Sequence, residues 1–457
     1  MRTVGLYTLG CKVSQYETEA ISEAFAKRGF SIAPFDTACD AYVINTCTVT
    51  AESDRKSRQI IRRAIAANPD AVVAVVGCYS QRSPDEIIKI EGVDVILGTD
   101  NKLLVVERVI DALESKASEP YCSVTDLANA GFEPMTVTSA PRTRAYVKIE
   151  DGCESRCTYC AISSARGPVR SKARQDVISE VEGLYKSGTR EIVLTGIETG
   201  SYGRDFNEAY GLADLIAELD DRHSCERIRL GSLAPELIGK SFVDKVKDKR
   251  ILAPHFHLSV QSGSNNVLRA MKRRYTRERA LENIEYIRAN IPSAQFTTDL
   301  MVGFPGETEE DFLDTVDFVR RARFIDAHVF AYSRRKGTPA ALYPGQIDES
   351  EKRRRSRELI RVKNEVRNSV LLDIVELGEP ISVILETECD GTFTAHSDFF
   401  AEVRVYAPTC SQGDMIDVIP VSCENGVILG KKSIIIYKWR YKNGKQQKDN
   451  GKNSCAL

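Results

Sequence analysis

Three cysteines lie close together near the middle of the chain, in the run from Gly152 to Cys160. Cys153, Cys157 and Cys160 are spaced C-x3-C-x2-C. Three thiolates this close can hold three irons of a 4Fe–4S cube, whereas a ferredoxin-type electron carrier uses four cysteines per cluster. The next cysteine, Cys225, is too distant to belong to the same loop. The spacing therefore predicts a cluster with one iron open to a ligand other than cysteine.

A zinc knuckle and a group of unrelated thiols are the alternatives. Zinc takes four ligands, usually from paired C-x2-C units or from cysteine and histidine together. No histidine and no fourth cysteine lies near this run. A disulfide framework is disfavoured, because the chain has 13 cysteines, an odd number, and starts without an evident secretion signal. The iron–sulfur interpretation is favoured.

Three further cysteines follow predicted strands in the first part of the chain. Cys11, Cys47 and Cys78 come directly after apolar runs at 4–9, 41–45 and 71–76. Strand and helix patterns alternate here, which is typical of a doubly wound α/β sheet. Because the carboxyl ends of parallel strands share one edge, we expect these thiols to converge. A cysteine can also simply pack after a strand, but three of three favour a second three-thiolate site with one open iron.

The remaining pattern predicts an α/β protein of several parts. Six strand-then-helix units follow residue 145, with strands expected at 145–149, 191–195, 228–230, 256–260, 297–302 and 327–332. Six units favour a partial (β/α) barrel, and the alternating runs after it favour a small β-barrel. The expected parts are an N-terminal parallel-sheet domain (1–115), a surface linker (116–140), a partial (β/α)6 barrel (141–372), a small β-barrel (373–440) and a disordered tail (441–457).

Composition excludes some classes of partner. The chain has 457 residues, 42% of them hydrophobic, and a net charge of −2, so it has no global basic field. Contact with nucleic acid would need local basic runs, which occur at 272–274, 334–336 and 352–355; each alone is usually a solvated face. No apolar run has the length of a membrane span. We expect a cytoplasmic protein in a reducing compartment.

Taken together, these features resemble the radical SAM methylthiotransferases over about residues 1–435. The shared landmarks are Thr8–Val13, Gln15–Glu17, Asn45–Thr50, Val76–Cys78, Gly152–Cys160, Arg166-Gly167, Ser259–Ser264 and Asp299–Glu307. The C-terminal part is similar to the family's RNA-binding TRAM domain. The motif Gly10-Cys11-Lys12-Val13 is most similar to the corresponding sequence of the branch that acts on threonylcarbamoyladenosine in tRNA.

The resemblance implies two 4Fe–4S clusters and S-adenosylmethionine (SAM) as cofactors. Cys153, Cys157 and Cys160 would hold the cluster that cleaves SAM to a 5′-deoxyadenosyl radical, and Cys11, Cys47 and Cys78 an auxiliary cluster that presents sulfur. Residues implied to contact SAM are Tyr159, Gly196, Glu198, Ser259, Gln261 and Gly303. Tyr159 could instead have a packing role, and glycines after strands are often only turns.

The implied reaction is methylthiolation of carbon 2 of threonylcarbamoyladenosine at position 37 of tRNA. The expected partners are a tRNA anticodon arm and an electron donor, and the protein is expected to be a monomer. Alternatives are the same chemistry on isopentenyladenosine in tRNA or on a ribosomal protein, and a non-enzymatic iron–sulfur protein that binds RNA or senses redox state. An electron-transfer protein, however, gains nothing from two open irons.

The sequence departs from the family pattern at three places. Ser14 stands where asparagine is common, and Ser163-Ser164 where a proline followed by an aromatic residue is usual. Glu198 stands where this branch often has histidine. None of the six cysteines is lost, so the departures concern loop rigidity and cofactor contacts rather than the cluster chemistry.

Overall fold

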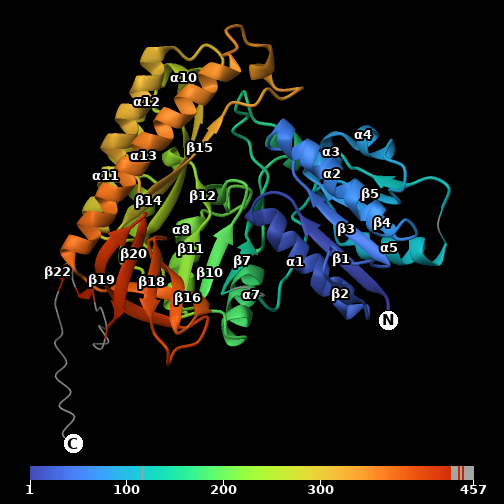
Figure 1. Ribbon diagram of the computed structural model, residues 1–457, viewed down its shortest axis with the longest axis horizontal. Coiled ribbons are helices and arrows are strands. Elements are labelled where there is room, and N and C mark those ends of the chain that lie inside the picture. Colours follow the sequence, from blue (N-terminus) through green and yellow to red (C-terminus); the bar gives the residue numbers. More distant parts are fainter. Residues whose placement is uncertain (116, 141–142, 434–440, 443–444, 447–457) are drawn as a thin grey trace, which may run out of the picture.

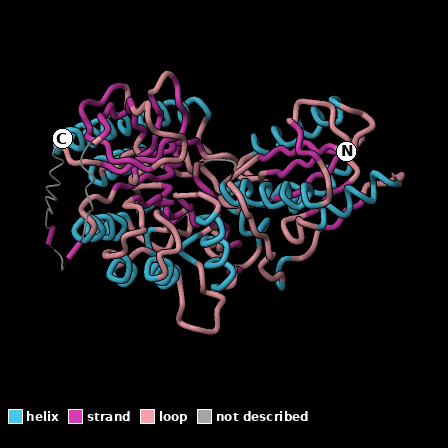
Figure 2. Tube along the Cα trace, turned by 90° about the horizontal axis from the view of Figure 1, so that it is seen from below, coloured by secondary structure: helices cyan, strands magenta, loops and turns pink. Residues whose placement is uncertain are grey.

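A computed structural model describes residues 1–115, 117–140, 143–433, 441–442 and 445–446. An N-terminal α/β domain lies beside a central partial barrel, and a small β-barrel adjoins the latter (Figure 1). Figure 2 shows the N-terminal domain as a separate lobe next to the rest of the chain. This mixed α/β architecture confirms the predicted fold class.

The N-terminal domain is built on a six-stranded sheet with the order β2-β1-β3-β4-β5-β6, in which every pairing is parallel. Its strands are β1 (Thr3–Thr8), β2 (Ser31–Ala33), β3 (Ala41–Thr46), β4 (Val72–Gly77), β5 (Val95–Leu97) and β6 (Tyr121–Ser123). Its helices are α1 (Lys12–Lys27), α2 (Ala51–Ala67), α3 (Cys78–Arg82), α4 (Pro84–Ile88) and α5 (Leu104–Glu114).

Both faces of this sheet are covered. Along β3, Val43 packs in the cluster that holds side chains of α1 and α5, whereas Ile44 packs with Ile61 of α2. Every residue of β3 and β4 is buried. Continuous apolar strands of this kind need helices on both faces, and helices on both faces are typical of a parallel sheet.

The segment expected to be a surface linker, 116–140, is partly built into the protein. Its residues 121–123 form β6, which pairs with β5 at the edge of the sheet. Met135 and Val137 are buried in a cluster with Tyr16 of α1. The expectation of a surface linker was therefore wrong for these residues, because short apolar stretches without a clear period gave no sign of their long-range partners.

The central part contains all six predicted strands, with boundaries shifted by at most one or two residues. They form two sheets, β11-β10-β7 and β12-β13-β14-β15, with parallel pairings. The strands are β7 (Arg144–Lys148), β10 (Glu191–Thr195), β11 (Arg227–Leu230), β12 (Ser232–Leu233), β13 (His255–Gln261), β14 (Gln295–Val302) and β15 (Asp326–Ala331). A short antiparallel pair, β8 (Glu150–Asp151) and β9 (Arg170–Ser171), follows β7.

The helices of the central part cover the outer face of its strands, except α6 (Ile162–Arg166), which contacts α3 of the N-terminal domain. The covering helices are α7 (Arg174–Lys186), α8 (Leu212–Asp221), α9 (Lys240–Val246), α10 (Asn265–Ala270), α11 (Arg277–Asn290), α12 (Glu309–Ala322) and α13 (Glu349–Leu377). Alternate strand residues such as Val147, Leu194 and Leu258 pack in one core with these helices. The intervening side chains face the barrel interior, and they are mostly polar.

The C-terminal part is a closed five-stranded barrel with the order β16-β17-β18-β20-β19. Its strands are β16 (Ile381–Cys389), β17 (Thr392–Ser397), β18 (Glu402–Tyr406), β19 (Met415–Glu424) and β20 (Val427–Lys432). The sequence pattern missed β17, whose outward residues are polar. Helix α13 runs to Leu377, past the expected boundary at 372, and Leu371 and Ile374 pack in the core of this barrel.

Of the expected disordered tail, 441–457, the structure describes only β21 (Tyr441–Lys442) and β22 (Lys445–Gln446), which pair with each other. The rest of that expectation lies outside the described residues. No helix in the described part of the chain has both the length and the apolar character needed to cross a membrane.

Candidate active site

The three N-terminal cysteines lie at one edge of the sheet. Cys11 precedes α1, Cys47 follows β3, and Cys78 begins α3 directly after β4. Because β1, β3 and β4 are neighbours, with Thr8 beside Asn45 and Thr46 beside Gly77, the three strand ends are adjacent. The thiols of Cys11 and Cys78 both act electrostatically on Cys47. The structure therefore brings these three cysteines together.

The thiols of Cys47 and Cys78 have raised pKa values. Burial, together with the neighbouring thiols, raises the pKa of Cys47 to about 11. Burial also raises the pKa of Cys78, against the lowering effect of Arg166. A buried thiol with a raised pKa stays protonated at neutral pH unless a metal ion displaces the proton.

The loop that contains the second triad depends on Gly152. This glycine has φ +95°, and a Cβ at its position would lie 1.8 Å from the carbonyl oxygen of Pro168. The loop folds back there, so that the amide of Cys153 donates a hydrogen bond to the carbonyl oxygen of Gly167 over 3.0 Å. The end of this segment, Arg166-Gly167, is thereby fixed next to the first cysteine of the triad.

The thiols of Cys153, Cys157 and Cys160 also lie close together. Cys153 and Cys157 both raise the pKa of Cys160, which burial above all brings to about 11. Hydrogen bonds also reach sulfur atoms of this triad. The amide of Ile162 donates to Cys160 Sγ over 3.3 Å, and Arg273 Nη1 donates to Cys157 Sγ over 3.4 Å.

Arg166 connects the two triads. This fully buried guanidinium donates from Nε to Cys78 Sγ over 3.3 Å, and from Nη1 to Glu17 (2.5 Å) and Asp151 (3.1 Å). Burial alone would raise the pKa of Glu17, but Arg166, Lys102 and Lys148 hold this pKa well below its ordinary value. Asp151 lies directly before the loop of the second triad, so one side chain contacts both Cys78 and the residue that precedes that loop.

Two carboxyl groups lie at the strand ends beside the second triad. Glu198 is buried, accepts a hydrogen bond from the amide of Ala234 over 2.9 Å, and acts electrostatically on Cys153. Burial raises the pKa of Glu198 to about 7. Glu150 Oε2 accepts from the amide of Glu198 over 2.9 Å, and a Cβ at Gly196 would lie 2.4 Å from the same oxygen. Gly196 therefore permits a close approach between β10 and Glu150.

The other residues expected to contact SAM lie in the same part of the barrel. The carbonyl oxygen of Ser259 accepts from Arg273 Nη2 over 2.7 Å, and Arg273 also acts electrostatically on Tyr159. Tyr159 is partly buried beside Phe304 and Met271. Gln261 adopts φ +71° at an irregularity in the pairing of β13 with β14. Gly303 lies against Lys352, so a side chain at 303 would collide with it.

The carboxyl oxygens and thiols in this region fit the expected cofactors. Glu150 Oε1 is buried without a hydrogen-bond partner, although Oε2 of the same group is bonded. A cationic group such as an amine would satisfy this oxygen. Within the described residues, no three His, Cys, Asp or Glu side chains are grouped to hold a single metal ion. In a cubane, by contrast, each thiolate binds a different iron, so six cysteines in two triads suit two clusters.

Most side chains of the basic runs have partners within the protein. Arg355 pairs with Glu307 over 2.7 Å and is buried, while Arg354 pairs with Glu351 over the same distance. Arg335 pairs with Asp54 of the N-terminal domain over 2.7 Å. Sequence alone could not show these partners, because most lie far away along the chain.

Two of the residues that depart from the family pattern make contacts with nearby residues. Ser14 Oγ lies 3.9 Å from Cys11 Sγ, and the carbonyl oxygen of Ser14 accepts from Asn45 Nδ2 over 3.0 Å. Ser164 Oγ donates to the carbonyl oxygen of Ala161 within α6 over 2.8 Å. Nothing in the structure explains Ser163.

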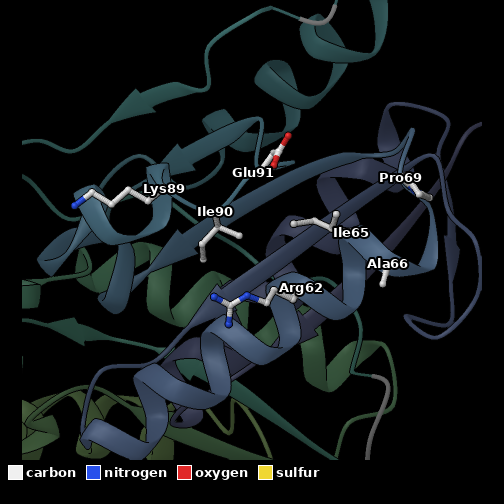
Figure 3. A pocket seen from close by; sticks show the side chains of 7 residues that line it. All are labelled: Arg62, Ile65, Ala66, Pro69, Lys89, Ile90 and Glu91. Atoms are coloured by element: carbon white, nitrogen blue, oxygen red, sulfur yellow. The ribbon is translucent and has the colours of Figure 1, made fainter.

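A surface hollow elsewhere has no part in this site. It lies on the N-terminal domain between α2 and the residues that follow α4 (Figure 3). None of the six cysteines lines it, and its lining consists of Arg62, Ile65, Ala66, Pro69, Lys89, Ile90 and Glu91.

Comparison with known proteins identifies the family. Residues 147–319 match the radical SAM superfamily, and residues 3–98 match the uncharacterised protein family UPF0004. The chain is 40% identical over 415 residues to the threonylcarbamoyladenosine tRNA methylthiotransferase MtaB of Bacillus subtilis, covering 88% of this chain and 90% of the relative. The chain belongs to the radical SAM methylthiotransferases. It is therefore an enzyme of the transferase class, as the resemblance implied.

Other relatives agree with this assignment. MtaB of Thermotoga maritima is 38% identical over 78% of this chain and 80% of its own length. The tRNA-2-methylthio-N(6)-dimethylallyladenosine synthase of Carboxydothermus hydrogenoformans is 35% identical over 83% of this chain and 87% of its own length. Among solved structures, the radical SAM methyltransferase TsrM of Kitasatospora setae shares the fold, with a TM-score of 0.55 and 17% identity over 75% of this chain and 77% of TsrM. The cofactors of this methylthiotransferase are two 4Fe–4S clusters and SAM.

Sequence reasoning missed three residues that the site contains. Arg166 was noted only as a landmark, Arg273 only as part of a basic run, and Glu150 not at all. Arg166 and Cys78 are 88 positions apart, and Arg273 and Cys157 are 116 positions apart. Only the fold brings these pairs together.

Proposed function

We propose that this enzyme methylthiolates carbon 2 of threonylcarbamoyladenosine at position 37 of tRNA. The observation that supports this most is the 40% identity, over nine-tenths of both chains, to a relative named for that nucleoside. The motif Gly10-Cys11-Lys12-Val13 supports the same branch of the family. The relatives named for dimethylallyladenosine are 32–35% identical, so the isopentenyl branch is the second candidate.

In this proposal each triad has its own task. Cys153, Cys157 and Cys160 hold the radical-generating cluster, and the N-terminal triad holds the auxiliary cluster. When bound, these clusters and SAM supply the electron, the hydrogen-abstracting radical and the methylthio sulfur. The protein's own contribution is to fix two cofactor sites around one C–H bond and to exclude water from it.

The residues around the second triad would orient SAM. Glu150 and Glu198 offer buried carboxyl oxygens beside Cys153, where a methionyl amine would satisfy the free oxygen of Glu150. Gly196 keeps the space next to Glu150 open. Tyr159, Ser259, Gln261 and Gly303 would form the remaining walls.

The division of labour among domains follows the same proposal. The N-terminal domain, about 1–115, would deliver sulfur, and the barrel, about 141–372, would generate the radical. The C-terminal domain, about 373–440, would contribute to tRNA binding. We propose that the enzyme acts as a monomer in the cytoplasm on the anticodon arm and receives its electrons from a separate donor.

A reaction with defined substrates tests this proposal. The anaerobically reconstituted enzyme is incubated with SAM, a reductant and anticodon stem-loop oligonucleotides that contain threonylcarbamoyladenosine, isopentenyladenosine or unmodified adenosine at position 37. We expect a methylthio product, detected by mass spectrometry, from the first oligonucleotide alone. Turnover of the isopentenyl oligonucleotide instead would assign the chain to the other branch.

A further inference from the structure

The interior of the central barrel is polar and incompletely filled. The side chain of Asp299 on β14 is 31% exposed, and that of the neighbouring His328 on β15 is 75% exposed. At one end the interior adjoins the C-terminal barrel, whose Phe400 stacks on His255 with ring centroids 5.3 Å apart. Phe400 itself remains 38% exposed. Protein side chains therefore leave part of this interior open.

Two carboxylates of this interior already have cationic or imidazole partners. Glu191 pairs with Arg144 over 2.9 Å and with Arg229 over 3.0 Å. Asp299 lies 3.3 Å from His257 and 3.5 Å from His328. Neither carboxylate makes a direct contact with Lys12, a further cation beside this interior.

Lys12 is the first residue of α1, directly after Cys11, and α1 contacts β7 of the barrel. The charged barrel groups that act on Lys12 are Arg229, Asp299 and Arg144, all in the interior. The Lys12 side chain thus extends from the N-terminal domain toward the barrel interior.

Within the described residues Lys12 makes no hydrogen bond and no ion pair. Lys12 is partly buried, and Arg229 and Arg144 place further positive charge near it, which Asp299 only partly offsets. An ammonium group partly withdrawn from water without a direct partner is costly, and an anion that binds beside it relieves that cost. The arrangement therefore suits an anionic ligand that enters the barrel interior.

The geometry points to a specificity role: we propose that Lys12 binds the carboxylate of the threonylcarbamoyl group of the substrate nucleoside. This inference rests on the proposed function. In adenine, ring nitrogen 1 lies between carbon 2 and the carbon that bears the N6 substituent. A base that presents carbon 2 to the N-terminal triad therefore places its N6 substituent close to the same triad. Lys12 is adjacent to Cys11 of that triad.

The charge of Lys12 also distinguishes the two candidate nucleosides. The threonylcarbamoyl group ends in a carboxylate, which an ammonium binds as a charge-assisted hydrogen bond. An isopentenyl group has no charge and cannot compensate a buried ammonium. Lys12 therefore favours the first nucleoside and disfavours the second.

Binding of modified oligonucleotides to the reconstituted enzyme, measured by fluorescence anisotropy, tests this inference. The oligonucleotides are anticodon stem-loops with threonylcarbamoyladenosine, the same nucleoside with its carboxyl group as a methyl ester, or unmodified adenosine. The enzymes are the wild type, Lys12→Met and Lys12→Arg. Lys27→Met, an exposed lysine at the other end of α1, serves as the matched control.

We expect the wild type and Lys27→Met to bind the carboxylate form about 10- to 100-fold more tightly than the ester, as for a hydrogen bond to a charged group. Lys12→Met should bind both forms equally, and Lys12→Arg should retain most of the preference. The iron content of each variant verifies that its clusters are present. Should Lys12→Met fail to fold, Lys12→Gln takes its place, with the same expected loss of preference.

The outcomes separate this inference from the proposed function. If the wild type prefers the carboxylate form and Lys12→Met keeps the full preference, Lys12 is not the recognising group. Equal wild-type affinity for carboxylate and ester also overturns the inference. If the wild type does not distinguish the threonylcarbamoyl oligonucleotide from unmodified adenosine, the proposed substrate itself is wrong. A uniform loss of affinity in Lys12→Met for all oligonucleotides would make Lys12 a phosphate contact and contradict the inference.

Discussion

Arg166 donates a hydrogen bond from Nε to the sulfur of Cys78 over 3.3 Å, and its Nη1 lies 3.1 Å from Asp151. Cys78 belongs to the N-terminal domain, whereas Asp151 precedes the cysteine loop of the barrel. The two cysteine triads are therefore connected through a single buried guanidinium. Its position relative to both sites makes Arg166 a positioning residue.

Replacing Arg166 with Met should destabilise the protein and change the N-terminal cluster. Glu17 would keep Lys102 and Lys148 but lose its third buried cation, so the loss of stability should stay below about 3–5 kcal/mol, the cost of a fully broken buried pair. A cation and a hydrogen bond near sulfur favour the reduced, more negative cluster. The midpoint potential of the N-terminal cluster should therefore fall, as measured by EPR-monitored redox titration together with thermal unfolding.

Two further variants show whether the charge and the position of Arg166 cause these changes. Arg166→Lys keeps the charge but not the planar fork, so it should shift the potential less than Met does. Arg174→Met removes an exposed arginine that pairs with Glu218, and should change neither quantity. An unchanged potential in a folded Arg166→Met enzyme would mean that the contact with Cys78 is only structural.

Each triad should be needed for a different step of the reaction. A variant with Cys11, Cys47 and Cys78 all changed to Ala should still cleave SAM to 5′-deoxyadenosine, but it should form no methylthio nucleoside. The corresponding variant of the barrel triad should lose all cleavage. Each should retain about half of the iron, from the stoichiometry of one cubane per triad. Product formed by the N-terminal variant would mean that the sulfur comes from elsewhere.

Gly152→Ala should remove the barrel cluster specifically. The new Cβ would lie 1.8 Å from the carbonyl oxygen of Pro168, in a backbone conformation with φ +95° that costs L-residues energy. Iron content should fall by about half and SAM cleavage should be lost. Gly183→Ala is the control, because Gly183 lies in α7 with open space around its Cβ position. Full iron in Gly152→Ala would contradict this account of the loop.

Glu191→Gln should loosen the contact between the two barrels in a pH-dependent way. Burial would raise the pKa of Glu191, but Arg229, Arg227 and Arg144 hold it below the ordinary 4.5. Its stabilising effect is therefore complete above pH 4.5 and declines as the pH falls further. We expect wild type to be more stable than Glu191→Gln by about 3–5 kcal/mol at pH 7.

Below pH 4.5 this difference should narrow by about 1.4 kcal/mol per pH unit. Urea unfolding of both proteins over a pH series measures it. Arg229 donates to the carbonyl oxygen of Asp398 in the C-terminal barrel over 2.8 Å, so limited proteolysis should release that barrel more readily in the variant. A constant difference across the series would show that ionised Glu191 is not the stabilising group.

The sequence predicted the parts of the site that follow from strand order. Cys11, Cys47 and Cys78 could be placed together because the ends of neighbouring parallel strands meet at one edge. The six barrel strands were found because their alternate residues are apolar. Strand β17 was missed, since only Phe393 of its inward residues is large and apolar, whereas Ala395 and Ser397 give little signal.

Contacts between distant side chains could not be predicted. The pairing of Arg355 with Glu307, for example, joins residues 48 positions apart. Likewise, the position of Lys12 between two domains depends on how those domains pack. Such contacts follow from packing, which no local pattern in the sequence encodes.

The central claim is tested most directly by mass spectrometry of tRNA nucleosides from cells with and without this gene. The account predicts that the methylthio form of threonylcarbamoyladenosine disappears on deletion, that its unmethylthiolated precursor accumulates, and that isopentenyl-type nucleosides do not change. Re-expression of the wild type should restore the modification, whereas the Cys11/Cys47/Cys78 triple Ala variant should not. Loss of the isopentenyl methylthio nucleoside, or an unchanged tRNA with a lighter ribosomal protein, would contradict the account.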